Sequence, residues 1–127
     1  MKRAMVVAGA LAMALPTTGS AQEGAGVVAD NIALYKARDM EGFLSTFAPD
    51  ACVIAHGITA CGHARIRAFY ALNFRPVAPE VTVRGFRPEG DQVIVRAAYD
   101  YGQGRVECCS TSRYQVRGGK IVRLVVD

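Results

Sequence analysis

Three patterns of apolar residues follow one another along this 127-residue chain. Ala4 to Leu15 is an uninterrupted apolar run. From Val27 onward, apolar side chains recur every three or four positions, which is typical of amphipathic helices. From Val81 onward, apolar and polar residues alternate, which indicates strands with one buried face. The pattern predicts a short apolar start, a mainly helical middle and a strand-rich end.

Three helices are predicted in the middle of the chain. The first begins at Val27, after a loose polar lead formed by residues 22–26. The second is N-capped by Asp39 and ends at Pro49-Asp50, and the third opens at Gly62. Their apolar faces carry, in chain order, Val28, Ile32, Tyr35, Phe43, Leu44, Phe47, Ile66, Phe69, Tyr70 and Phe74.

The strands are marked by alternation and by turn residues. A short hairpin is predicted between the second and third helices, with His56-Gly57 as its turn. The later strands are predicted around Val81 and Val83 and at residues 92–101, 105–116 and 120–126. Helices followed by a run of antiparallel strands indicate an α+β domain with the helices on one face of the sheet.

The apolar start has the features of a secretory signal peptide. Lys2 and Arg3 precede the twelve-residue run Ala4–Leu15, and Gly19-Ser20-Ala21 offers small residues for cleavage. Twelve helical residues rise about 18 Å, which is too short for a hydrocarbon core of about 30 Å. We therefore expect residues 1–21 to be a signal peptide and residues 22–127 to be one exported domain, periplasmic or secreted. An uncleaved anchor or a buried helix is the alternative.

The net charge of the predicted mature domain does not indicate a nucleic-acid partner. Two of the 15 basic residues lie in the predicted signal peptide, so 13 bases face 11 acids and the remaining net charge is +2. This is too mild to indicate nucleic acid. Arginines on the predicted outer sheet face, interleaved with Ile94, Ala98 and Val125, indicate a solvated face or a homodimer interface instead. They are Arg84, Arg96, Arg113 and Arg123.

Three segments together resemble a known family. They are Tyr35-Lys-Ala-Arg-Asp39, Phe47-Ala-Pro-Asp-Ala51 and the helix that runs from Gly62 through Ile66 to Phe69-Tyr70. In this order, and followed by a strand-rich tail, they resemble the SnoaL-like branch of the NTF2-like superfamily over residues 27–127. The resemblance implies a cone: three N-terminal helices packed on a curved, mostly antiparallel sheet, with an open end that holds a small apolar molecule. It also implies dimers through the outer sheet face.

Ketosteroid isomerase is a relative in this superfamily, and its catalytic acids are absent here. The resemblance places its general-base aspartate at Ala55, its oxyanion-hole tyrosine at Asn31 and its second oxyanion donor near Ser112. Without a base beside the substrate carbon, the proton shuttle of that enzyme cannot operate. The interpretation as an isomerase is therefore poor, although Asn31 and Ser112 could donate hydrogen bonds to a ligand.

The strands themselves predict the polar lining of a pocket. If Ser112 faces inward, alternation along its strand places Cys108, Ser110 and Tyr114 inward with it. Val95, Ala97, Leu124 and Val126 would supply the apolar wall. The predicted ligand-binding residues are Asn31, Tyr99, Tyr101, Ser110, Ser112 and Tyr114. The alternative is that these side chains fill the cone and satisfy one another.

Histidine chemistry is weakly indicated. His56 is a weak candidate catalytic residue, because its place as the first residue of a tight turn before Gly57 explains it more easily. His63 falls at the exposed start of a helix. Together with Cys52 and Cys61 they match no common zinc spacing, so we expect no metal site. No Ser-His-Asp order, phosphate loop or G-x-S-x-G motif is present, and no cofactor is expected.

The hairpin register predicts a disulfide between Cys52 and Cys61. Pairing outward from His56-Gly57 sets Cys52 opposite Cys61, in a non-hydrogen-bonded pair whose Cα atoms lie about 4.5 Å apart. A metal site or two free thiols in a slipped register are the alternatives. Cys108 and Cys109 are interpreted as buried small hydrophobes, because a bridge between neighbours on a strand would distort the ladder.

Two functions remain open at this point. One is a binder or enzyme for a small, largely apolar molecule in the cone. The other is a structural module that dimerises through its sheet face, with the cone filled by side chains. A cavity reached by Asn31, Tyr99 and Ser112 would favour the first.

Overall fold

The computed structural model describes residues 16–127, so most of the predicted signal peptide lies outside the described residues. Its helices are α2 (Pro16–Lys36), α3 (Met40–Ser45), α4 (His63–Tyr70) and the short 3-10 helix η1 (Ala71–Phe74). Its strands are β1 (Phe47–Ala55), β2 (Ile58–Cys61), β3 (Glu80–Glu89), β4 (Gln92–Asp100), β5 (Val106–Arg117) and β6 (Lys120–Val126). Within this part of the chain, no helix is long and apolar enough to cross a membrane.

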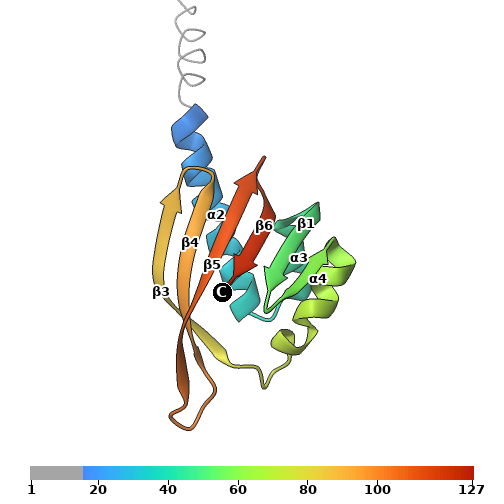
Figure 1. The fold of residues 1–127 in the computed structure, drawn as a ribbon, viewed down its shortest axis with the longest axis vertical. Helices are drawn as coiled ribbons and strands as arrows, with labels where there is room; N and C mark the ends of the chain where they lie inside the picture. The colour runs from blue at the N-terminus through green and yellow to red at the C-terminus, as the bar shows by residue number, and fades with distance from the viewer. Residues whose placement is uncertain (1–15) are drawn as a thin grey trace, which may run out of the picture.

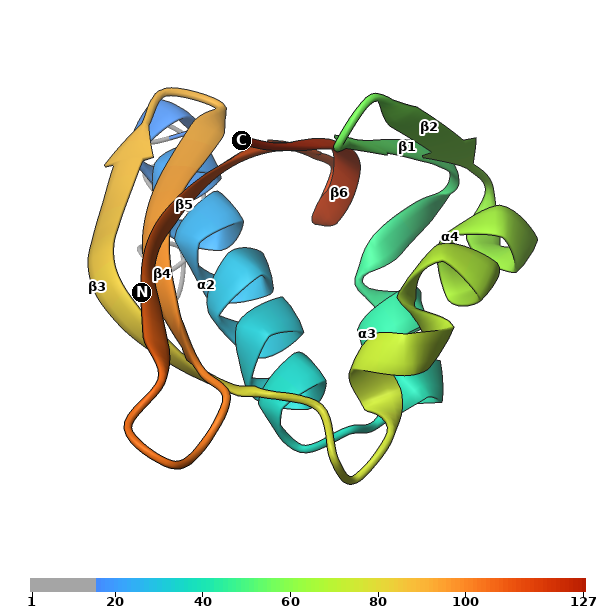
Figure 2. The same ribbon diagram turned by 60° about the horizontal axis from the view of Figure 1, so that its bottom comes forward.

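The six strands form one curved sheet in the order β2-β1-β6-β5-β4-β3. Only the β1–β6 pair is parallel, so the prediction of a mostly antiparallel α+β fold is confirmed. The long helix α2 runs along the concave side of the sheet, and α3 and α4 lie beyond it, near β1 and β2 (Figures 1 and 2). The sheet and helices together have the shape of the expected cone.

The first helix is longer than predicted. Residues 22–26 were expected to be loose, but they lie inside α2. Gly24 is buried, and a Cβ atom placed on it would lie 3.6 Å from the Cβ of Val116 on β5. Packing against the sheet thus keeps helical a segment whose glycines disfavour a helix, a tertiary effect that propensity alone does not reveal.

The prediction of three comparable N-terminal helices is wrong. The N-cap at Asp39 is confirmed, since its Oδ1 accepts a hydrogen bond from the Gly42 N–H at 2.9 Å. However, α3 has six residues, and Phe47 belongs to β1, where it pairs with Ile121 of β6. The spacing from Phe43 to Phe47 imitates a continuing helix because both side chains are buried. Among residues 16–127, only α2 and α4 are therefore substantial helices, separated by the β1–β2 hairpin that the sequence predicted.

The predicted hairpin register is confirmed. Ala55 lies opposite Ile58 and Cys52 opposite Cys61. The turn places both His56 and Gly57 at positive φ, of 53° and 76°, as a tight two-residue loop requires. The structure joins Cys52 to Cys61 by a disulfide, with the Cα atoms 4.1 Å apart.

The interpretation of Cys108 and Cys109 as buried hydrophobes is wrong. The β4–β5 register shifts there: Ala97 pairs with Ser110 and Ala98 with Cys108, so Cys109 is an extra residue in a bulge. The two cysteines are joined by a disulfide, with Cys108 exposed and Cys109 partly buried. The expected distortion of the ladder is present, and the bulge accommodates it.

An aromatic cluster fills the space between α2, α3 and α4. The ring of Phe43 lies 5.0 Å from those of Tyr70 and Phe74, 5.3 Å from Phe47 and 5.9 Å from Tyr35, measured between centroids. Such tilted and edge-to-face contacts are the arrangements that aromatic rings favour. This cluster holds the three helices together and forms one wall of the site described next.

Candidate functional site

A cavity of about 480 Å³ lies between the concave face of the sheet and the helices. This volume falls within the range of pockets for small organic molecules, about 300–1,000 Å³. Aliphatic side chains from the sheet line it as expected, among them Val95, Ala97, Leu124 and Val126. The cone therefore encloses space that these side chains do not fill.

All six predicted ligand-binding residues line this cavity: Asn31, Tyr99, Tyr101, Ser110, Ser112 and Tyr114. On β5 the alternation holds from Ser110 to Tyr114, as a pleated strand requires. Tyr101 lies just past the end of β4 and is 41% exposed, so it belongs to the rim. Tyr99 and Ser110, on neighbouring strands, place their hydroxyl oxygens 3.1 Å apart.

Asn31 is held in a defined orientation. Its Nδ2 donates to Thr46 Oγ1 at 2.8 Å, and that hydroxyl donates onward to the carbonyl of Phe43 at 2.7 Å. Since the threonine proton is already used, the amide nitrogen of Asn31 must face Thr46. The side chain is 2% exposed, and among the described residues its Oδ1 has no hydrogen-bond partner. Asn31 therefore offers a ligand an acceptor, whereas the sequence suggested a donor.

Residues that the sequence analysis did not assign to the pocket also line it. Tyr35, Phe43, Phe69, Tyr70 and Asn73 come from the helices and η1. All of these except Asn73 belong to the apolar helix faces that the sequence analysis predicted to be buried. Periodicity, however, does not tell whether a buried face meets the core or a cavity.

Burial changes the acidity of the phenols in this site. Loss of hydration raises the pKa of Tyr35, Tyr70 and Tyr114, and neighbouring phenols raise each of them further. These groups are protonated throughout the neutral range and can donate hydrogen bonds.

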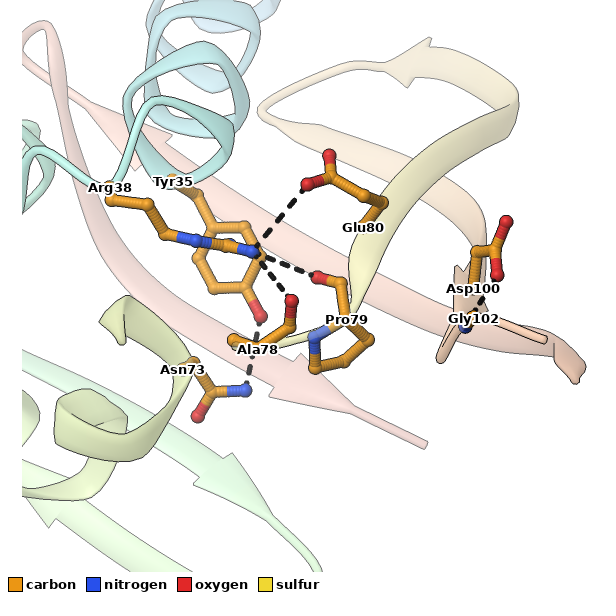
Figure 3. A network of polar contacts seen from close by, with 8 residues as sticks. All are labelled: Tyr35, Arg38, Asn73, Ala78, Pro79, Glu80, Asp100 and Gly102. Carbon is orange, nitrogen blue, oxygen red and sulfur yellow. Dashed lines mark hydrogen bonds and ion pairs between the residues drawn. The ribbon is translucent and has the colours of Figure 1, made fainter. Parts of the chain in front are cut away.

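A polar network fixes the segment that leads from η1 into β3 (Figure 3). The Arg38 guanidinium donates to the carbonyls of Ala78 and Pro79 at 2.8 and 3.2 Å, and it lies 3.9 Å from a carboxylate oxygen of Glu80. Asn73 Nδ2 donates to the hydroxyl of Tyr35 at 3.1 Å. The end of α2 thus holds this segment, and Pro79 and Asn73 with it, against the cavity.

We expect Arg38→Met to lower the free energy of unfolding by about 1–3 kcal/mol, because it leaves two carbonyls without a charged donor. The side chain is only 18% exposed, so water replaces these contacts poorly. Urea denaturation of the two proteins measures the change. Arg87→Met removes an ion pair whose arginine is 65% exposed and should cost less than about 1 kcal/mol. Equal losses in the two variants would contradict the role given to Arg38.

The histidines lie in different environments. His56 lines the cavity from the exposed β1–β2 turn, next to the buried Ala55, which also lines it. His63 Nε2 lies 2.9 Å from the carbonyl oxygen of Phe47, a contact that joins the start of α4 to β1. Two carboxylates, Glu107 and Asp127, belong to the lining. In the described part of the chain, no group of three or more histidine, cysteine or acidic residues could hold a metal ion.

Residues 28–124 match the family of SnoaL-like domains. The chain belongs to the SnoaL-like domain family. The match covers α2 from Val28 onward, the other helices, the hairpin and the strands up to Leu124, and so includes nearly the whole cavity lining. The resemblance seen in the sequence is thereby confirmed. Among curated proteins, no sequence matches this chain.

Solved structures share the fold of this SnoaL-like chain at low sequence identity. A presumed polyketide cyclase from Sinorhizobium meliloti is 22% identical, with a TM-score of 0.72 over 80% of this chain and 94% of that protein. TerC, co-crystallised with polyporic acid, is 24% identical, with a TM-score of 0.69 over 83% and 90%. A presumed ketosteroid isomerase from Kribbella flavida is 16% identical, with a TM-score of 0.73 over 83% and 76%.

For this SnoaL-like chain we expect no isomerisation of β,γ-unsaturated ketosteroids above the rate in buffer. Ala55 occupies the position that the resemblance assigns to the general base, and a methyl group cannot accept a proton from the substrate. The appearance of the conjugated ketone, followed by ultraviolet absorbance, measures the rate. Substantial activity would contradict this expectation, and its loss in His56→Ala would then identify the base.

Proposed function

We propose that this SnoaL-like protein binds a small, largely apolar molecule in the cavity between α2 and the concave face of the sheet. The observation that carries the proposal is the cavity itself, about 480 Å³ of space whose wall combines aliphatic and aromatic side chains with hydroxyl and amide groups. Small-molecule sites have this composition. A cone filled by its own side chains, as the structural alternative requires, would leave no such space.

Two of the similar structures support the same reading. One is named as a presumed polyketide cyclase, and the other was crystallised with polyporic acid. Conversion of the bound molecule, by an isomerase, lyase or cyclase type of reaction, is the finer form of the proposal. His56 is its weak catalytic candidate, because it lines the cavity and can accept a proton.

The test is to capture the ligand and then to block its site. The protein is incubated with a metabolite extract, repurified, and the bound compounds are identified by mass spectrometry. Ala97→Phe places a larger side chain in the cavity and should abolish the capture. Ala29→Phe makes the same change at an exposed position of α2 and should leave capture intact. Capture that survives Ala97→Phe, or no capture at all, would contradict the proposal.

We also propose that the protein is exported and cleaved after Ala21. Cleavage there removes the start of α2 but keeps Gly24 and the rest of the packed helix. The mass of protein recovered from the periplasm or medium should correspond to residues 22–127. Recovery of a chain that retains Met1 or Lys2 would contradict cleavage.

The outer sheet face supports a further proposal, that two copies form a homodimer. Ile94 and Ala98 are buried within the chain, but Val125 is partly exposed and Arg96 and Arg113 are exposed beside them. The aliphatic parts of arginine side chains cover apolar surface, and arginine is enriched at interfaces. Light scattering should give twice the mass of one chain, and Arg113→Glu should give a monomer. A monomeric unsubstituted protein would contradict the dimer.

A further inference from the structure

Besides Tyr101 at the rim, four tyrosines from four different elements line the cavity. Tyr35 comes from α2, Tyr70 from the end of α4, Tyr99 from β4 and Tyr114 from β5. The rings of Tyr35 and Tyr70 are 6.1 Å apart between centroids. Burial is the main cause of the raised pKa values of Tyr35, Tyr70 and Tyr114. The charge that a neighbouring phenolate would carry raises each of these pKa values further. The four phenols therefore belong to one cavity lining, in which Tyr35 and Tyr70 are direct neighbours.

The hydroxyl protons of two of these phenols are free for a ligand. The Tyr35 oxygen accepts from Asn73, which leaves its own proton unused. Tyr70 has no hydrogen-bond partner among the described side chains, although burial raises its pKa well above the ordinary value and keeps it protonated. Both side chains are partly buried and line the cavity, so a ligand oxygen can accept from donors that no protein group uses.

The charge of the lining restricts the ligand further. In the part of the chain that the structure describes, no lysine or arginine lines the cavity, whereas Glu107 and Asp127 do. An anion placed there would lose part of its hydration without gaining a lysine or arginine partner, and it would meet two carboxylates. A neutral oxygen acceptor meets the phenols without this cost.

We infer that the cavity selects neutral carbonyl compounds, with the carbonyl oxygen accepting hydrogen bonds from Tyr35 and Tyr70, and that it rejects anions of the same shape. This inference rests on the proposed function and names the class of molecule that the site takes. The rings of Phe43, Phe69 and Tyr70 in the same wall provide flat apolar surface for the body of such a compound.

Three naphthalene probes of similar shape test the inference. They are 2-acetylnaphthalene, which carries a neutral carbonyl, 2-isopropylnaphthalene, which has no acceptor, and 2-naphthoate, which is an anion. Titration calorimetry should give the tightest binding for the ketone, by about tenfold over the hydrocarbon, because each of its two hydrogen bonds contributes about threefold. The naphthoate should bind more weakly than the hydrocarbon.

Phenol substitution then locates the contact. Tyr70→Phe and Tyr35→Phe should each reduce the preference for the ketone over the hydrocarbon by about threefold or more. The hydrocarbon is the internal control, because its affinity depends on the shape of the cavity and not on the hydroxyls. A loss of fold would weaken both probes equally, and circular dichroism of each variant detects it.

The outcomes separate this inference from the proposed function. If the probes bind but naphthoate equals or exceeds the ketone, the cavity is a binding site and the inference is wrong. The same holds if neither tyrosine substitution changes the ratio of ketone to hydrocarbon affinity. If none of the three probes binds although a compound is captured from the metabolite extract, the inference is wrong and the proposed function stands. Failure of both experiments contradicts both.

Discussion

Replacing Phe43 by alanine is expected to lower the free energy of unfolding by about 3–5 kcal/mol, the usual cost of removing a buried phenylalanine side chain. Phe43 is 2% exposed, and its ring contacts the rings of Tyr35, Phe47, Tyr70 and Phe74. One substitution therefore removes the centre of the cluster that holds α2, α3 and α4 together. The whole free energy of unfolding of a small domain is about 5–15 kcal/mol, so the variant should be close to unfolding at 37 °C.

Urea denaturation followed by circular dichroism measures this loss. Phe86→Ala is the matched control, because its side chain on β3 is 38% exposed and should cost much less. Phe43→Leu keeps most of the apolar volume and should recover part of the stability. A loss below about 1 kcal/mol for Phe43→Ala would show that the helices do not depend on this cluster.

Removal of the Cys52–Cys61 disulfide should cost about 2–3 kcal/mol, because the bridge closes a loop of ten residues and restricts the unfolded chain. Cys61 is exposed and Cys52 partly buried, so a double change to serine leaves no buried hole. Thermal unfolding of the oxidised protein and of the double variant, at one protein concentration, measures the difference. The Cys108–Cys109 bridge closes no loop between its residues, so the corresponding double variant should lose less.

Peptide mapping without reductant checks the connectivity on which this prediction depends. Protein folded under oxidising conditions should yield a linked pair of peptides that carry Cys52 and Cys61, and no alkylatable thiol. A link from Cys52 to Cys108 or Cys109, or four free thiols, would contradict the Cys52–Cys61 disulfide of the hairpin.

The strand-rich half of the fold was predictable because alternation is a local signal. The hairpin register followed from one turn, and Ser110, Ser112 and Tyr114 followed from the two-residue period of β5. Errors arose where tertiary contacts overrule local patterns. Phe47 lies at helical spacing from Phe43, but pairing with Ile121, more than seventy residues away, makes it part of a strand.

The candidate site was predicted on its sheet side and missed on its helix side. Side chains along a strand alternate between two faces, so one residue known to face inward shows which of its neighbours also face inward. A helix stripe indicates burial without naming the neighbour, and Tyr35 and Tyr70 were therefore assigned to the core. The bulge at Cys109 was also beyond reach, because the register shift that brings two adjacent cysteines to the cavity depends on how β4 pairs with β5.

The position of β6 determines when this chain can finish folding. Its residues 120–126 lie between β1 and β5, so Val53 near the start of the sheet has Leu124 as its neighbour. The chain is synthesised from its N-terminus, so the edge of β1 that pairs with β6 stays unpaired until the last strand has been made. Pairings of such high contact order form slowly, and an unpaired apolar edge can join another chain. A chain that ends before residue 120 therefore leaves the facing edges of β1 and β5 open.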